Sequence, residues 1–263
     1  MIIKDKIIWI TGASSGIGEA LAYAFNKLGN KVILSARSED KLRMVAKNCP
    51  FPEMVSCLRM DLMEADTMED TVRQAIGIFG RVDILVNNAG ISQRSLIVDT
   101  QLSVYKQLMD VNYLGTVALS KTLLPYFIGQ GSGHYVTVTS LMGKFGSPLR
   151  SGYCAAKHAL HGFFDVMRME HEKDGVGVTL VCPGFVQTDI ARNALTADGS
   201  AQNYQDKATA NGLTPAEFAN RLIKAVQKKK FEAYIGKGEV RGVYLKRFFP
   251  RLLHKVVLKS QVV

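Results

Sequence analysis

The chain has 263 residues, of which 47% are hydrophobic, 21% charged and 8% aromatic, with 23 glycines, seven prolines and four cysteines. This composition excludes a disordered chain, a collagen-like repeat and a disulfide scaffold. The formal charge of +10 lies entirely in residues 221–263, which carry 12 Lys and Arg against Glu232 and Glu239, whereas residues 1–220 are balanced. A basic end on a neutral body favours contact with an anionic surface, and nucleic acid is not an expected partner.

The chain shows no sign of export or membrane insertion. Its apolar runs all fall short of the roughly 20 residues that a spanning helix requires. Residues 1–10, MIIKDKIIWI, lack the apolar core and cleavage site of a secretory signal. The four cysteines, at positions 49, 57, 154 and 182, have no metal-ligand spacing and read as reduced thiols. We therefore expect a cytoplasmic protein without a metal site, peripheral at a membrane if the basic end binds one.

Short β-branched runs alternate with longer stretches of helical periodicity. Strands are predicted at 6–11, 31–36, 55–60, 82–87, 133–140, 176–182 and 231–235, and helices at 19–28, 39–48, 65–79, 103–129 and 153–173. This alternation predicts an α/β fold with a doubly wound, Rossmann-like parallel sheet. No linker divides residues 1–244, which are predicted to form one domain. The polar segment 191–212 follows the sixth strand and is predicted to be a lid over the substrate.

A glycine-rich loop, TGASSGIG at 11–18, joins the first predicted strand to the first helix. Gly12 allows a sharp turn, Gly16 allows the backbone to approach a pyrophosphate, and Gly18 allows the helix to pack on the strand. The amino end of that helix offers free N–H groups and a positive dipole to phosphates. The loop is either a simple turn or a nucleotide site, and its position between strand and helix favours a site formed by Gly12, Ser14, Ser15, Gly16, Ile17 and Gly18.

The loop has the spacing G-x-x-x-G-x-G, which resembles the short-chain dehydrogenase/reductase family. Further matches lie in the family's order over about residues 4–190, namely Asn87–Gly90 (NNAG), Asn112, Ser140, Tyr153-x-x-x-Lys157 and Pro183–Thr188 (PGFVQT). Ser140 lies 13 residues before Tyr153, the usual spacing in the family. Any one match could arise by chance, but the ordered set is specific. The chain is therefore identified as resembling this family.

The chemistry of the tyrosine and lysine follows from their spacing. Tyr153 and Lys157 lie four residues apart on one predicted helix and share a face. A phenol has a pKa near 10, and we expect the adjacent ammonium to lower the pKa of Tyr153. Ser140 ends the fifth predicted strand, where its hydroxyl reaches a substrate oxygen. Alone, Ser140 would read as a helix cap and the Tyr–Lys pair as coincidence.

The resemblance implies a role for each of these residues. Tyr153 would protonate a carbonyl oxygen in reduction or deprotonate an alcohol in oxidation. Lys157 would also bind the nicotinamide ribose, and Ser140 would orient the substrate. Asn112 would hold a water of the proton relay, although alone it would read as satisfying buried backbone. No metal is required.

The remaining predicted cofactor residues are Asn88, Ala89, Gly90, Thr188, Asp61 and Leu62. Asp61 has a second interpretation, a helix N-cap forming a capping box with Glu64. Ala36 stands where NAD-preferring relatives place an aspartate, and the adjacent Arg37 suits a ribose phosphate. We therefore expect NADP(H) rather than NAD(H). Ser15 weakens this expectation, because many NADP-preferring relatives carry a basic residue there.

Residues 245–263 show a helical pattern with an apolar face and a basic face. Pro250 falls inside the pattern, so the helix is expected to start near Phe249 or to kink there. The helix is interpreted as lying on an anionic membrane, contacting a second subunit, or covering the substrate cavity. A lipophilic substrate would suit the first interpretation, by analogy with membrane-associated members of the family.

The sequence thus predicts an oxidoreductase that transfers hydride between NADP(H) and a carbonyl/alcohol pair, with a homodimer or homotetramer expected from the resemblance. The substrate itself would be selected by residues 93–96, 141–150 and 191–212. A sugar or nucleotide-sugar substrate is less compatible with the short chain after the sixth strand. The alternative outside catalysis is a sensor or scaffold that binds NADP(H) without turnover, although a sensor has no need of Tyr153 and Lys157.

Overall fold

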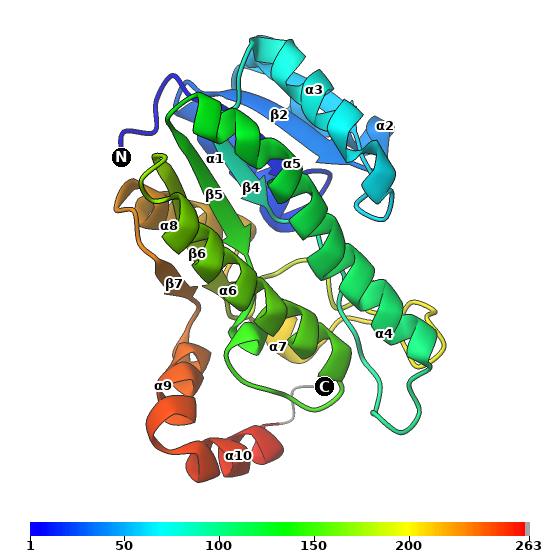
Figure 1. Cartoon of the computed structure of the whole chain (residues 1–263). Helices are drawn as coiled ribbons and strands as arrows, with labels where there is room; N and C mark the ends of the chain where they lie inside the picture. The colour runs from blue at the N-terminus through cyan, green and yellow to red at the C-terminus, as the bar shows by residue number, and fades with distance from the viewer. Residues whose placement is uncertain (261–263) are drawn as a thin grey trace.

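A computed structural model describes residues 1–260 of the chain. Within them, seven strands form one sheet in the order β3-β2-β1-β4-β5-β6-β7 (Figure 1). The strands are β1 (Ile7–Thr11), β2 (Lys31–Ala36), β3 (Val55–Arg59), β4 (Ile84–Asn87), β5 (Gly133–Val138), β6 (Val176–Pro183) and β7 (Glu232–Ile235). Every neighbouring pair is parallel. The predicted doubly wound, Rossmann-like sheet is confirmed.

Helices cover both faces of this sheet. The helices of the described residues are α1 (Gly16–Lys27), α2 (Glu39–Lys47), α3 (Met68–Phe79), α4 (Leu102–Met109), α5 (Gly115–Gly129), α6 (Ser151–His171), α7 (Lys207–Ala210), α8 (Pro215–Gln227), α9 (Arg241–Phe248) and α10 (Pro250–Lys259). α1, α2 and α8 bury apolar side chains against one face, including Leu21, Phe25, Leu42, Phe218 and Leu222. α3, α5 and α6 do so on the other, with Val72, Leu123, Phe127 and Phe164. Within β1 the side chains alternate between these two cores, as a strand buried on both sides requires.

The predicted strands agree with the observed ones, but several helices differ. The helix predicted over 103–129 is interrupted by a π-helical turn at Asp110–Leu114, which separates α4 from α5. α8 was not predicted at all, although its start carries a local signal. Thr214 accepts a hydrogen bond from the Glu217 amide, and the Glu217 carboxylate accepts one from the Thr214 amide, forming a capping box before Pro215.

The C-terminal helices α9 and α10 pack below the carboxyl end of the sheet (Figure 1). Phe249 has φ −137° and ψ 62°, so the helix predicted from residue 245 is divided there, and the last three residues of its range lie outside the described part. Leu253 of α10 is buried beside Leu141, Phe145 and Cys182. Among residues 1–260, no helix is long and apolar enough to cross a membrane.

His134 is a buried titratable group within the sheet. It lies on β5, and its Nε2 is 2.9 Å from the Thr179 hydroxyl oxygen on β6. Burial, and the cations Lys229 and Arg168, lower its pKa from 6.5 to about 4. The folded chain therefore holds a neutral imidazole at pH 5, where an unfolded chain protonates it.

We predict that acid weakens the fold through His134. Between pH 7 and pH 5 the unfolded state binds a proton that the folded state excludes, so the free energy of unfolding falls as pH falls, by about 2 kcal/mol. Urea unfolding of the wild type and His134→Gln at both pH values checks this, since the variant loses that part of the dependence. His158→Gln, at an exposed histidine on α6, is the control and keeps it. Equal pH dependence in wild type and His134→Gln would contradict the prediction.

Candidate active site

A cavity of about 1080 Å³ opens at the carboxyl ends of the strands. One end lies at Arg37 after β2, and the other is walled by Leu253 and Val256 of α10. Between them the wall includes predicted site residues from separate segments: Gly12, Ser14, Ser15, Gly16, Ile17, Asp61, Leu62, Asn88, Ala89, Gly90, Ser140, Tyr153, Lys157 and Thr188. Ligands bind at this edge of an open α/β sheet because the strand order reverses there.

The glycine-rich loop is shaped by close backbone contacts. Gly12 has φ +64°, and a Cβ there would lie 2.8 Å from the Ala89 Cα. A Cβ on Gly18 would lie 2.2 Å from the Gly12 carbonyl oxygen, so Gly18 stands behind the loop and lets α1 pack against it. The Asn88 side-chain amide donates to the Thr11 and Gly12 carbonyls, at 3.0 and 3.2 Å. The loop and the segment after β4 therefore form one rigid wall at the amino end of α1.

Asp61 and Leu62 also reach the wall, but Asp61 does not cap a helix. Its Oδ1 accepts a hydrogen bond from the Met63 amide at 3.1 Å, and α3 begins only at Met68 after a 3-10 turn. The capping box with Glu64 is therefore wrong. The Asp61 carboxylate instead holds its own turn beside the cavity.

Ser140, Tyr153 and Lys157 meet where β5 ends beside α6. Ser140 lies close enough to the Tyr153 side chain to lower the pKa of its phenol. The Lys157 ammonium donates to the Val138 carbonyl at 3.0 Å and lies 5.8 Å from the centre of the Tyr153 ring. The Ser140 hydroxyl oxygen also accepts from the Met142 amide at 3.1 Å, capping the 3-10 turn Leu141–Gly143. The two interpretations of Ser140, cap and site residue, are therefore compatible.

The predicted lowering of the Tyr153 pKa is wrong for the chain alone. Burial raises the pKa of Tyr153, and this outweighs the lowering by Ser140, Arg94 and Arg150. Burial also lowers the pKa of Lys157 to about 8. Both groups are buried in the protein wall, and the solvation that the charged form loses there exceeds the stabilisation that neighbouring groups provide.

Asn112 lies behind the wall, fully buried in the π-helical turn. Its side-chain oxygen accepts from the Ile91 amide at 2.8 Å, and its side-chain nitrogen donates to the Ile91 carbonyl at 2.9 Å. The observed contacts match the backbone-satisfying interpretation of this residue. They hold the segment after β4 in place beside Lys157, since a Cβ on Gly90 would lie 2.7 Å from the Asn112 oxygen and 3.4 Å from the Lys157 nitrogen.

At the Arg37 end, the wall contains a second cation that the sequence analysis missed. Lys41 lies one turn after Arg37, in the first turns of α2, and both residues line the cavity with Ala36 and Ser38. The i, i+4 spacing of Arg37 and Lys41 was the available signal. No acidic residue follows β2 directly, as the sequence Ala36-Arg37-Ser38 already indicated.

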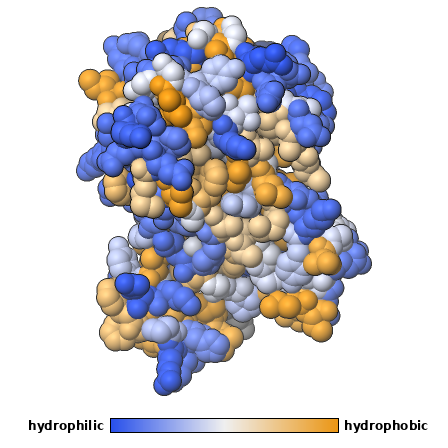
Figure 2. Space-filling view, viewed as in Figure 1, coloured by the Kyte–Doolittle hydropathy of each residue, from blue (hydrophilic) through white to orange (hydrophobic). Residues whose placement is uncertain are grey.

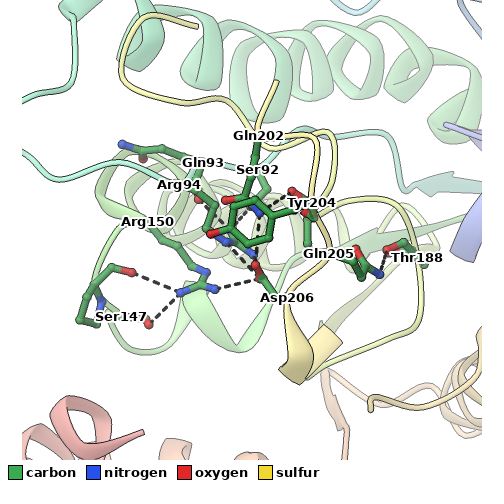
Figure 3. Close-up of polar contacts among 12 residues, drawn as sticks. Ser92, Gln93, Arg94, Ser147, Arg150, Thr188, Gln202, Tyr204, Gln205 and Asp206 are labelled. Carbon is green, nitrogen blue, oxygen red and sulfur yellow. Dashed lines mark hydrogen bonds and ion pairs between the residues drawn. The ribbon is translucent and has the colours of Figure 1, made fainter. Parts of the chain in front are cut away.

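The three segments predicted to select the substrate, 93–96, 141–150 and 191–212, meet in a buried polar cluster whose pairing the sequence did not reveal (Figure 3). Arg94 and Arg150 line the cavity, and both form ion pairs with Asp206. The segment predicted as a lid adds Asn193, Leu195 and Thr209 to the wall. No local pattern could have revealed this cluster, because its members come from distant segments and each resembles an ordinary surface charge in sequence.

Comparisons with known proteins identify the family. The profile of the short chain dehydrogenase family matches residues 6–199. The chain is 37% identical over 268 residues to "Dehydrogenase/reductase SDR family protein 7-like" of Drosophila melanogaster, covering 99% of this chain and 82% of that protein. It is 38% identical over 266 residues to "Dehydrogenase/reductase SDR family member 7B" of Xenopus laevis, covering 97% and 81%. The human "Dehydrogenase/reductase SDR family member 7" is 45% identical over 202 residues, 74% of this chain and 60% of that protein.

Solved structures agree on the fold. A short chain dehydrogenase/reductase from Burkholderia phymatum, in complex with NAD, has a TM-score of 0.83 at 24% identity and covers 100% of this chain and 98% of its own. A short-chain dehydrogenase from Streptomyces avermitilis has a TM-score of 0.81 at 24% identity, covering 98% of both chains. The protein belongs to the short-chain dehydrogenase/reductase family of oxidoreductases.

Proposed function

We propose that this protein uses NADP(H) to interconvert a carbonyl and an alcohol, with Tyr153 as the proton donor or acceptor. The observation that carries the proposal is the meeting of Ser140, Tyr153 and Lys157 on the wall of one cavity. The other part of that wall is the glycine-rich loop at the amino end of α1. A dinucleotide held between them brings its reactive ring to the tyrosine.

The wall fits such a cofactor because its glycines allow the segments to pack closely and present backbone to the cavity. A Cβ on Gly16 would lie 3.0 Å from the Thr188 side chain, and one on Gly90 would meet Asn112. We infer that the loop amides hold the pyrophosphate and that Lys157 holds the ribose beside Tyr153. When bound, the nicotinamide supplies hydride in reduction and accepts it in oxidation.

Residues of this chain donate the proton and stabilise the charges that its transfer creates. In reduction the Tyr153 phenol donates its proton to the carbonyl oxygen as negative charge develops there, and the Ser140 hydroxyl hydrogen-bonds the same oxygen. The Lys157 ammonium, held by the Val138 carbonyl, offsets the charge left on the phenolate. Asn112 acts through the Ile91 backbone, which it holds in register with this site.

We predict that Tyr153→Phe lowers kcat/KM for carbonyl reduction about 1000-fold, because only the ionisable oxygen is removed. NADPH oxidation against ketones and aldehydes of increasing chain length measures this, and NADPH binding is expected to persist. Tyr126→Phe, at an exposed position on α5, is the control with unchanged turnover. Near-normal turnover by Tyr153→Phe would contradict the role. A wild type that binds NADPH but reduces no carbonyl would favour the sensor alternative.

The preference for NADP(H) is proposed from charge at the Arg37 end. Arg37 is exposed and lines the cavity with Lys41, so two cations face the position of a ribose 2′-phosphate. A guanidinium binds phosphate through two parallel hydrogen bonds. With Ala36 at the end of β2, no carboxylate opposes the phosphate there.

We predict that Arg37→Asp reduces the affinity for NADPH about tenfold or more, because it removes a cation and adds an opposing charge. Affinity for NADH is expected to rise or to stay level. Fluorescence titration of both cofactors measures the ratio. Arg43→Asp changes charge equally at an exposed position on α2, the helix that follows Arg37, and serves as the control. An unchanged ratio in Arg37→Asp would show that Arg37 does not contact the phosphate.

A lipophilic substrate is proposed from the far end of the cavity. Beyond Tyr153 a large part of the wall is apolar and comes from the loop after β5 and the C-terminal helices, with Leu141, Met142, Phe145, Leu245, Leu253, Val256 and Val257, while Ser147 and Arg241 of the same segments add polar groups. Burying such side chains against an apolar substrate gains about 25 cal/mol per Å². The cavity-cover interpretation of α10 is supported by this arrangement.

We further propose that the outer side of α9 and α10 docks on an anionic membrane. Phe248, Phe249, Leu252 and Leu258 are at least half exposed there. Residues 240–260 contain six Lys and Arg and no Asp or Glu. Figure 2 shows hydrophobic side chains at the lower end of the molecule, where Figure 1 places these helices and the loop before α4. That loop exposes Leu96, Ile97 and Val98. A homodimer or homotetramer stays an expectation from the resemblance.

We predict that changing Arg251, Lys255 and Lys259 together to Glu weakens binding to vesicles containing phosphatidylserine at least about tenfold, since each cation near an anionic surface contributes about 1 kcal/mol. These residues form one stripe on α10. Changing the exposed Lys224, Lys228 and Lys230 to Glu alters net charge equally and is the control. Sedimentation with vesicles of phosphatidylcholine, with and without phosphatidylserine, measures the effect. Equal binding by both triple variants and wild type would contradict membrane docking by α10.

A further inference from the structure

A buried carboxylate joins the lid segment to the site (Figure 3). Asp206 is 1% exposed, and its Oδ2 accepts from Arg94 Nε at 3.1 Å and from a terminal nitrogen of Arg150 at 3.4 Å. The other oxygen accepts from Gln202 at 3.3 Å. The two guanidinium side chains are only 6% and 5% exposed. Opposite charges are therefore paired away from water beside the substrate end of the cavity.

The segment that carries Arg94 also holds the start of the helix that carries Tyr153. The Gln93 side-chain oxygen accepts from the Gly152 amide at 2.8 Å and from the Tyr153 amide at 3.4 Å. These are amides of the first turn of α6, which have no partner within the helix. The same segment pairs with Leu195 of the lid through two backbone hydrogen bonds, at 2.8 and 2.9 Å. The segment 92–94 therefore contacts the lid at Leu195, Asp206 through Arg94, and the start of the tyrosine helix through Gln93.

We propose that Arg94 and Asp206 are a positioning pair for the reaction: Asp206 latches residues 191–206 over the substrate end, and Arg94, held by that latch, sets the charge environment of Tyr153. This inference rests on the proposed function of Tyr153. Neither residue needs to touch the reacting atoms, because Asp206 acts on the lid segment and Arg94 acts on Tyr153.

The charges around Tyr153 give the two residues opposite effects. Arg94 after β4 and Arg150 before α6 lower the pKa of Tyr153, Cys154 on α6 raises it, Ser140 after β5 lowers it, and Lys157 lies against the ring. The Asp206 carboxylate offsets the positive charge of both arginines. Removing Arg94 therefore favours the protonated phenol, whereas removing the Asp206 charge favours the phenolate.

The test compares Arg94→Met and Asp206→Asn, with Asp198→Asn as the control at an exposed lid carboxylate. Both test variants break the latch, so hydrogen exchange of the amides in 191–206 is expected to accelerate about tenfold or more in each. The alkaline limb of the kcat–pH profile for carbonyl reduction is expected to move up in Arg94→Met and down in Asp206→Asn, by about half a pH unit or more. Asp198→Asn is expected to leave the pH profile unchanged.

Arg94→Lys keeps the positive charge but loses the planar guanidinium that contacts Asp206. This conservative variant serves as a second test in case Arg94→Met does not fold. We expect faster exchange in 191–206 with an unshifted pH profile. Shifts of the same sign in Arg94→Met and Asp206→Asn would reduce the pair to a structural role and overturn the proposal, as would unchanged exchange. If the wild type reduces no carbonyl, the proposed function fails while the exchange comparison still decides whether the latch exists.

Discussion

The parallel pairing of β1 with β4 is the constraint on which the site depends. The two strands meet in register from Ile8 and Ile84 onward, at the point where the order of the sheet reverses. Just beyond it, the Thr11 hydroxyl oxygen accepts from the amides of Asn88 and Ala89, each at 3.0 Å. This junction brings the glycine-rich loop against the segment after β4. The contact leaves no room for a Cβ at Gly12, and the same junction directs the next residues toward the lid and α6.

Burial governs the electrostatics of the site. Tyr153 and Lys157 both lie in the wall, so each is biased toward its neutral form, the phenol by a raised pKa and the amine by a pKa of about 8. In contrast, Ser140, Arg94 and Arg150 favour the phenolate of Tyr153. The pKa of Tyr153 therefore depends on how three separate segments position Arg94, Ser140 and Arg150 around it. The buried ion pairs of Arg94 and Arg150 with Asp206 add little stability by themselves, but removing one partner leaves an unpaired buried charge and is costly.

The C-terminal helices have two environments at once. The inner side of α10 completes the apolar wall through Leu253, while its outer side exposes Leu252 and Leu258 beside a run of cations. One short amphipathic helix can therefore close a cavity and face an anionic surface. The proposed lipophilic substrate and the proposed membrane contact therefore involve the same element, because α10 supplies both a part of the cavity wall and the exposed apolar and basic side.

The fold class, the strands and most of the predicted residues that line the cavity could be read from the sequence. Buried parallel strands read as apolar β-branched runs, and the glycines and the Tyr–Lys pair keep short, fixed spacings. α8 could also have been found, from the capping box at Thr214. The tertiary structure alone decided the rest. The direction of the Tyr153 pKa depends on burial, the partners of Asn112 on a π-helical turn, and the Arg94–Asp206–Arg150 cluster on contacts between residues far apart in the chain. Such features arise from desolvation and long-range proximity, which no local pattern of residues encodes.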